Sequence, residues 1–193
     1  MGEQASASAA SRESRRYDLG GLTPIANGRI TVNLAGDSHI HHDIRDLDGF
    51  LPEDGQVDEF YLCHTLEHVP STDYVRFLHD LHRKLRVGGK VIVIQTDAGE
   101  VIRSWMAGHL SFRAMRTTLF TPADRLRENP FHMHHNMWTA EDLADDFRAV
   151  GFAPETFDAG TWAYDQLDEL YPDSTRRCWG VPVKNLGVIA TKT

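Results

Sequence analysis

Apolar residues form continuous runs and helically spaced runs along this chain, and their alternation predicts an α/β fold. Val57–Cys63 is a short, mainly apolar run opened by Asp58, and it is long enough for a buried strand. Val91–Ile94 is a continuous apolar run with β-branched residues, which also predicts a buried strand. Between them Ser71 and Thr72 offer helix N-cap oxygens, and apolar residues recur at helical spacing until Gly88–Gly89, which should end the helix. A strand, a helix and a second strand form the unit of a parallel sheet, so we expect such a sheet at the centre of the fold.

The same patterns predict further strands on both sides of this unit. Tyr17–Thr23 should hold the end of a first strand and a glycine turn, and Ile30–Leu34 should be the second strand. Phe152–Phe157 and Leu186–Thr191 should be the last two strands. A parallel connection normally takes a dozen or more residues and a helix, so the short distance before Ile30 predicts an abbreviated first crossover.

Helical spacing predicts the remaining elements. Thr139 should cap a helix that ends at Gly151, with Asp142 completing a capping box. Amphipathic patterns also predict helices over Gly99–Gly108 and His109–Leu119, and a helix or lid over Trp162–Tyr171. Residues 1–16 are rich in alanine and serine and should form a disordered tail, which leaves 17–193 as a single domain.

Composition narrows the classes of function. The 193 residues carry a formal net charge of −8, and no run of Lys or Arg exceeds two residues, which argues against a phosphate-binding track for nucleic acid. No apolar run approaches the length of a membrane span, so we expect no membrane insertion. The two cysteines, Cys63 and Cys178, are too few for a disulfide framework and favour a cytoplasmic location.

The segment 58–69, DEFYLCHTLEHV, followed by a helix and by RKLRVGGKVIVIQTD at 83–97, resembles the pattern of class I S-adenosylmethionine-dependent methyltransferases. The similarity is nearest to their small "predicted SAM-dependent methyltransferase" branch, which is like methyltransferase type 11, and covers Tyr17 to about Phe157. It implies a Rossmann-like, mostly parallel sheet with an antiparallel C-terminal strand beside the Val91–Ile94 strand. It also implies a substrate-covering insertion over about 108–137, and S-adenosyl-L-methionine bound at the carboxyl ends of the strands.

The resemblance assigns cofactor contacts to residues near those strand ends. They are Asp18, Gly20, Gly21, Asn33, Leu34, Asp43, Ile44 and His64. Two positions depart from the family pattern, because Leu22 replaces a usual glycine and Asn33 replaces the acid that bridges the ribose hydroxyls. We therefore expect weaker cofactor binding, which Asn33→Asp should strengthen; the alternative is a degenerate fold that acts as a non-catalytic partner subunit.

His135 is the predicted catalytic base, because the resemblance places it in the substrate cavity and an imidazole can remove a hydroxyl proton near neutral pH. Asp97 and His64 are the reserves, and a histidine that only positions the loop is the alternative. The expected reaction is methylation of a small molecule, with a sugar or natural-product hydroxyl as the acceptor. A homodimer is compatible with this interpretation.

Histidines gather in two short segments of the sequence. His39, His41 and His42 should be solvated loop residues and not metal ligands, because the side chains of metal ligands must converge. Alternation along an extended segment points His41 and His42 to opposite faces. His132 and His134 would share one side of an extended segment, which is compatible with a metal but is the less favoured interpretation. Glu67 and His68 are expected to brace and pack their own turn. No metal site is predicted, and a metal-dependent enzyme is kept as a third hypothesis.

Overall fold

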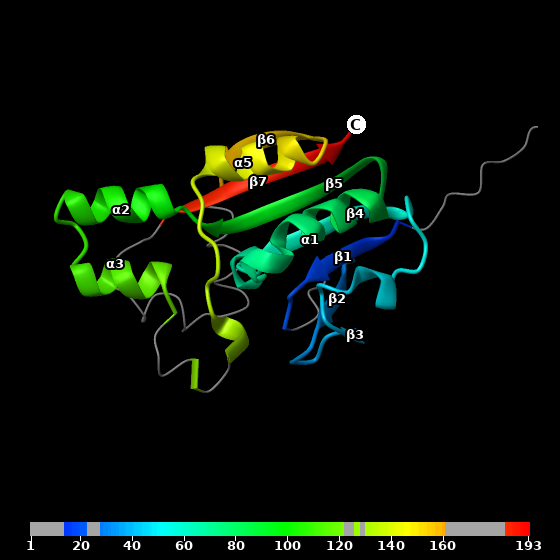
Figure 1. Cartoon of the computed structure of the whole chain (residues 1–193), viewed down its shortest axis with the longest axis horizontal. Coiled ribbons are helices and arrows are strands. Elements are labelled where there is room, and N and C mark those ends of the chain that lie inside the picture. Colours follow the sequence, from blue (N-terminus) through cyan, green and yellow to red (C-terminus); the bar gives the residue numbers. More distant parts are fainter. Residues whose placement is uncertain (1–13, 23–27, 122–125, 128–129, 161–183) are drawn as a thin grey trace, which may run out of the picture.

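A seven-stranded sheet lies at the centre of the computed structural model, which describes residues 14–22, 28–121, 126–127, 130–160 and 184–193 (Figure 1). The strands are β1 (Arg16–Leu19), β2 (Ile30–Asn33), β3 (Ile40–His41), β4 (Val57–Cys63), β5 (Leu85–Thr96), β6 (Phe152–Asp158) and β7 (Asn185–Lys192). Their order across the sheet is β3-β2-β1-β4-β5-β7-β6. Neighbours among the first five pair in parallel, and β7 is antiparallel to β5 and β6. The predicted Rossmann-like sheet with an antiparallel C-terminal strand is confirmed.

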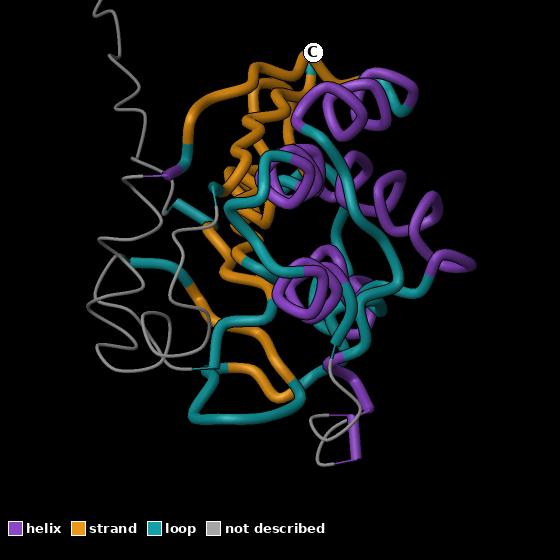
Figure 2. Tube along the Cα trace, turned by 90° about the vertical axis from the view of Figure 1, so that its left-hand side faces the viewer, coloured by secondary structure: helices purple, strands orange, loops and turns teal. Residues whose placement is uncertain are grey.

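The described helices lie on one side of the sheet, as Figure 2 shows. They are α1 (Ser71–Lys84), α2 (Ala98–Met106), α3 (Phe112–Leu119) and α5 (Ala140–Ala149), with 3-10 turns η1 (Leu47–Gly49), η2 (Leu66–His68) and η3 (Pro130–His132). α1 and α5 cover the sheet, whereas α2 and α3 extend past the carboxyl end of β5 (Figure 1). The predicted capping box at Thr139 and Asp142 is present at the start of α5.

Side chains of β4 alternate between two layers of the core. Phe60 and Leu62 are fully buried in the cluster that includes Phe77 of α1 and Phe147 of α5. Tyr61 points to the opposite face and packs in a separate, smaller cluster. This period of two is what a strand buried on both faces requires, and it explains why three apolar residues, Phe60, Tyr61 and Leu62, follow one another.

The start of α1 differs from the expectation that Ser71 or Thr72 caps it. The capping position is Pro70, and no side-chain cap bond is present there. The Ser71 hydroxyl instead donates to the backbone carbonyl of His135 and to the side chain of Asn136. A tertiary contact to a segment more than sixty residues away therefore takes the hydroxyl that local helix chemistry would use.

The end of α1 also differs from the prediction. The helix stops at Lys84, because Leu85 already pairs with Val57 of β4 as the first residue of β5. Gly88 has a φ of 75° and lies inside β5, near the point where the register of the β4–β5 pair shifts. Its left-handed conformation thus serves an irregularity in a strand, and the prediction that Gly88–Gly89 ends the helix is wrong.

The connection between the parallel neighbours β1 and β2 is short, as predicted. Only residues 20–29 separate the two strands, and the described ones, 20–22 and 28–29, contain no helix. The amide of Asp37 donates to the carbonyl of Leu22, so the loop after β2 packs on this turn. The predicted helix or lid at Trp162–Tyr171 and most of the N-terminal tail lie outside the described residues. Within the described residues, no helix is long and apolar enough to cross a membrane.

Asp146 of α5 supports a stability prediction. Its carboxylate accepts hydrogen bonds from the Tyr74 hydroxyl at 2.8 Å and from the Trp138 indole at 2.9 Å, and both rings are buried. Asp146→Ala would leave two buried donors without this acceptor, so we expect it to lower the free energy of unfolding by about 2 kcal/mol. Asp145→Ala is the control, because the ion pair of Asp145 with Arg148 is exposed to solvent. Equal urea midpoints for the two variants would contradict the prediction.

Candidate cofactor and substrate site

A cavity of about 450 Å³ opens at the carboxyl ends of the parallel strands. The predicted site residues on its wall are Gly20, Asn33, Leu34, Asp43, Ile44, His64 and His135. They come from the turns and loops after β1, β2, β3 and β4 and from the segment before α5. Four strand ends therefore converge on one hollow, and its volume is in the range of small-molecule sites. Leu22 also lines the hollow.

The turn after β1 requires glycine at position 20. Gly20 has a φ of 92°, and a Cβ built there would lie 2.4 Å from the Thr65 hydroxyl oxygen and 2.6 Å from its methyl carbon. The Gly20 amide also donates to the carbonyl of Val32 in β2. The backbone of the turn thus reaches the loop after β4 with no space for a side chain at position 20.

Asn33 holds this turn from the neighbouring strand. Its side-chain amide donates to the Gly20 carbonyl at 2.7 Å, and its side-chain oxygen accepts from the Ala35 amide at 3.3 Å. Both ends of the side chain therefore have structural partners, although the residue lines the cavity. The amide donor is the feature that an aspartate in this place would lack.

This contact reverses the expectation for Asn33→Asp. A carboxylate would meet the Gly20 carbonyl oxygen across the present hydrogen bond, and two acceptors at that distance repel each other. We expect the variant to weaken cofactor binding by about tenfold, corresponding to about 1.4 kcal/mol. Calorimetric titration with S-adenosylhomocysteine measures this. Tighter binding would show that Asn33 leaves the turn and reaches the ligand.

Asp43 and Arg45 form the polar part of the wall beside Ile44. Arg45 donates to both carboxylate oxygens of Asp43, at 2.9 Å and 2.5 Å, and these hydrogen bonds hold the pKa of Asp43 below its usual range. The carboxylate is therefore ionised and oriented at neutral pH. It retains acceptor capacity for a ligand amino group, and the adjacent Ile44 and Leu34 supply apolar surface on the same wall.

His64 occupies a strained position directly after β4. It has a φ of 49°, in the left-handed region that residues with a side chain rarely adopt, and its amide donates to the Ile94 carbonyl of β5. Its Nδ1 lies 3.4 Å from a carboxylate oxygen of Glu67. Such conformations persist where the surrounding structure holds them and are common at functional sites.

The charges on Glu67 and His68 follow from their surroundings. Burial of Glu67 favours its neutral form, but the hydrogen bond and charge of His64, with the charge of His68, bring the net pKa of Glu67 below its ordinary value. Burial lowers the pKa of His68, although Glu67 opposes the shift. A carboxylate beside a neutral imidazole is therefore the expected state of this turn at neutral pH.

Asp18 lies near the end of β1 but is not part of the described cavity wall. It is 3% exposed, and a Cβ on Gly21 would lie 2.7 Å from one of its oxygens, so the carboxyl group packs against the glycine turn. Burial raises the pKa of Asp18 to about 6, with partial opposition from the charge of Arg29. A positive ligand group near the turn would favour the ionised form.

The raised pKa predicts the pH dependence of stability. Because the folded-state pKa of Asp18 exceeds its ordinary value of 3.8, its contribution to folding is fully present below about pH 4 and is lost as the pH rises through about 6. We expect Asp18→Asn to raise the free energy of unfolding at pH 8 by about 2 kcal/mol, with little effect near pH 4. Urea unfolding of both proteins at each pH provides the measurement. A gain that is equal at both pH values would exclude this cause.

The two predicted catalytic residues lie in different places. His135 is exposed on the cavity wall, and its backbone amide donates to the Glu67 carbonyl at 2.7 Å. Asp97 is not among the described lining residues; its side chain accepts from the amide of Glu100 and caps α2. The geometry thus keeps His135 as the candidate base, and Asp97 has a structural function as a helix cap.

Several cavity residues were not singled out from the sequence as ligand contacts. Among them are Thr65, His68, Val69, Pro70, Phe131 and His132. They belong to the turn after β4 and to the segment around η3, which are far apart in sequence. The LEH motif and the unusual composition of Phe131–Trp138 were visible signals, but only the fold shows that they meet at one hollow.

No protein family matches this chain by sequence, and no curated protein matches it. Solved structures resemble its fold. A SAM-dependent methyltransferase from Archaeoglobus fulgidus is 14% identical, with a TM-score of 0.54 over 93% of this chain and 87% of that one. One from Mesorhizobium loti is 15% identical, with a TM-score of 0.55 over 92% and 90%. The 1,6-didemethyltoxoflavin-N1-methyltransferase of Burkholderia thailandensis, solved with 1,6-didemethyltoxoflavin and S-adenosylhomocysteine, is 14% identical, with a TM-score of 0.55 over 93% and 72%. The chain has the fold of class I SAM-dependent methyltransferases.

Proposed function

From this shared fold, we propose that the protein transfers a methyl group from S-adenosylmethionine to a small molecule. The observation that carries the proposal is the cavity at the ends of β1 to β4, where the Gly20 turn approaches Thr65 too closely for any side chain. A bare backbone turn at this point of an α/β sheet is suited to a ligand that must lie against main-chain atoms. The described lining holds several groups that can recognise a nucleoside.

The wall offers complementary surfaces for the parts of the cofactor. Leu34 and Ile44 provide apolar contact for an adenine ring, and the oriented carboxylate of Asp43 can accept from its amino group. The Gly20 turn, with Asp18 buried behind it, suits the charged methionine portion. This arrangement supports cofactor binding in spite of Asn33, whose side chain holds the turn.

The chemistry that the bound cofactor supplies is an activated sulfonium methyl group. The chain must then hold the acceptor in line with that methyl and exclude water, and such alignment can remove roughly 7–11 kcal/mol of barrier. His64, directly after β4, and His135, in the segment before α5, both line the cavity. We assign acceptor positioning to this part of the hollow.

A hydroxyl group of a sugar or natural product is the proposed acceptor. Oxygen must lose its proton as the methyl arrives, and His135 is the imidazole that we assign to receive it. With S-adenosylmethionine bound, the acceptor oxygen would take the methyl group and neutral S-adenosylhomocysteine would leave. The imidazole of His135 would hold the acceptor proton until water removes it. The acidic net charge of −8 and the two cysteines support a small-molecule acceptor and a cytoplasmic location.

Calorimetric titration with S-adenosylmethionine and S-adenosylhomocysteine tests the proposal. Micromolar binding of either ligand to the wild-type protein supports it. Absence of heat and of thermal stabilisation at millimolar ligand would overturn it in favour of a non-catalytic partner subunit. Transfer of a labelled methyl group to a panel of hydroxylated acceptors, compared with amine acceptors of similar size, then separates oxygen from nitrogen methylation.

A further inference from the structure

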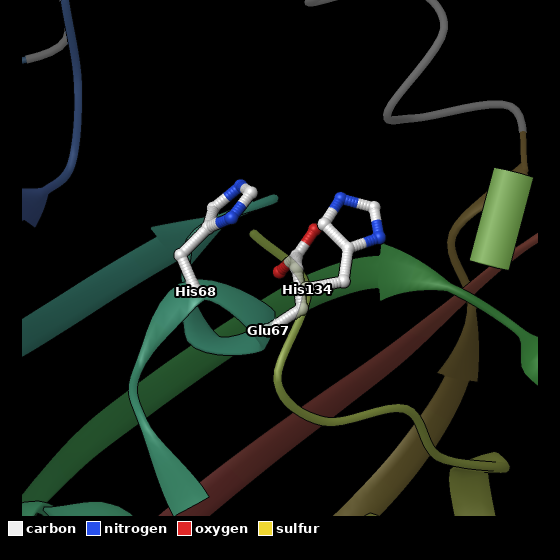
Figure 3. Close-up of side chains that lie close together, drawn as sticks. All are labelled: Glu67, His68 and His134. Carbon is white, nitrogen blue, oxygen red and sulfur yellow. The ribbon is translucent and has the colours of Figure 1, made fainter. Parts of the chain in front are cut away.

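Glu67, His68 and His134 converge beside the cofactor cavity (Figure 3). Glu67 and His68 come from η2, the turn after β4, and His134 comes from the extended segment that follows η3. One nitrogen of each imidazole and one carboxylate oxygen all lie within 4.8 Å of one another. Two imidazoles and a carboxylate at this separation have the donor types and spacing from which divalent transition-metal sites are built.

Glu67 provides an unpaired acceptor in this cluster. The residue is 6% exposed, and its Oε2 has no hydrogen-bond donor among the described residues. The other carboxylate oxygen lies 3.4 Å from Nδ1 of His64. A buried carboxylate oxygen with no donor is unfavourable by itself, and a cation would satisfy it.

Both histidines are held in the state that metal binding needs. Nδ1 of His68 lies 3.1 Å from the Met133 carbonyl, and Nδ1 of His134 lies 3.1 Å from the Leu119 carbonyl. A carbonyl oxygen only accepts, so each Nδ1 carries the proton and each Nε2 retains its lone pair. Metal-bound histidines are typically oriented in this way, by a second hydrogen bond from the ring to a backbone carbonyl.

A small hollow adjoins the cluster. Its volume is about 20 Å³, and Glu67, His134 and Gln95 line it. Gln95 is 2% exposed, and both polar atoms of its side chain lack partners among the described residues. A hollow of this size holds one water molecule, to which Gln95 can hydrogen-bond. Three protein ligands and one water complete a tetrahedral coordination shell.

We propose that Glu67, His68 and His134 bind one divalent transition-metal ion of the zinc class, with a water facing Gln95 as the fourth ligand. The ion would tie the segment after η3 to the turn after β4. Because His68 and the η3 residue His132 both line the cofactor cavity, this tie would fix the two sides of that wall relative to each other. The site is defined by its own ligands and does not depend on the proposed methyl transfer.

Metal content and metal-dependent stability of the full chain, produced without a histidine tag, test the site. After removal of metal with a chelator and addition of zinc, we expect about one tightly bound equivalent per chain and a higher unfolding temperature than in chelator. Glu67→Gln and His134→Ala should each retain less than about a tenth of an equivalent and lose the zinc-dependent rise. His79→Ala is the matched control, because His79 is exposed on α1, and it should behave as wild type.

Three outcomes would overturn the proposal. They are wild-type protein with less than about a tenth of an equivalent, variants that retain wild-type zinc, and a His79→Ala protein that loses zinc as the variants do. Circular dichroism in chelator shows whether the variants are folded. If their spectra match that of the zinc-free wild-type protein, a loss of zinc binding cannot be attributed to unfolding. Zinc binding without cofactor binding would reject the proposed methyl transfer and keep the metal site. Cofactor binding without zinc binding would reject the metal site and keep the proposed methyl transfer.

Discussion

Gly20→Ala should abolish measurable cofactor binding at ligand concentrations that saturate the wild-type protein. The added Cβ would lie 2.4 Å from the Thr65 hydroxyl oxygen, so either the turn or the loop after β4 must move. The left-handed φ of 92° adds about 1–2 kcal/mol of backbone strain, and overpacking typically adds about 1–3 kcal/mol. We expect at least about 100-fold weaker binding of S-adenosylhomocysteine, because the displaced turn is part of the cavity wall.

Two further variants separate the causes of this effect. Gly55 also has a positive φ, of 66°, but a Cβ added there would have nothing within 4 Å, so Gly55→Ala isolates the backbone strain. It should cost stability by about 1 kcal/mol and leave ligand affinity unchanged. Thr65→Ala combined with Gly20→Ala removes the two closest side-chain atoms and should restore part of the binding. Calorimetry and urea unfolding measure the two quantities, and full affinity in Gly20→Ala would remove this turn from the cofactor site.

His135→Ala should lower kcat for a hydroxyl acceptor by about 10²- to 10⁴-fold, which is the usual effect of losing a general base. The affinity for S-adenosylhomocysteine should change little, because the proposed cofactor contacts at the strand ends do not involve the imidazole. His135 binds Glu67 through its backbone amide at 2.7 Å, so the loop contact survives truncation of the side chain. Steady-state kinetics with an acceptor from the labelled-methyl panel provides the measurement.

A series of acceptors with increasingly acidic hydroxyl groups distinguishes a base from a positioning residue. An acceptor that is already ionised needs no base, so the loss caused by His135→Ala should shrink along the series. A positioning residue would give the same loss for every acceptor. A constant ratio of wild-type to variant kcat would therefore assign His135 to positioning and remove the proton-transfer step.

The order and type of most elements could be predicted because the relevant signals are local, although the two-residue strand β3 was not predicted. The strand at Val57–Cys63 and the capping box at Thr139 and Asp142 were both found where the pattern places them. The ends of α1 could not be predicted, because Leu85 leaves the helix to pair with Val57. Such pairing is a long-range property, and the local glycine signal at Gly88 carries no information about it.

The cavity was partly predictable for a topological reason. Residues that follow parallel strands meet at one edge of the sheet, so Gly20, Asn33 and His64 could be grouped without knowing their contacts. The contacts themselves change their interpretation. Asn33 donates to Gly20 instead of remaining free for the ribose, and Glu67 faces His134 across 67 residues of sequence. Contacts of this kind depend on side-chain direction in the folded chain, which spacing alone does not specify.

The position of β7 between β5 and β6 bears on how the protein matures during translation. All the described ladder pairing of β6 is with β7, which is residues Asn185–Lys192. The ribosome delivers β1 to β5 first, and these strands can already associate as a parallel sheet while later residues are still being made. β6 must wait with unpaired backbone groups until β7 emerges and inserts beside β5. Nascent chains stalled before residue 185 should therefore recruit chaperones more strongly than chains released after residue 192.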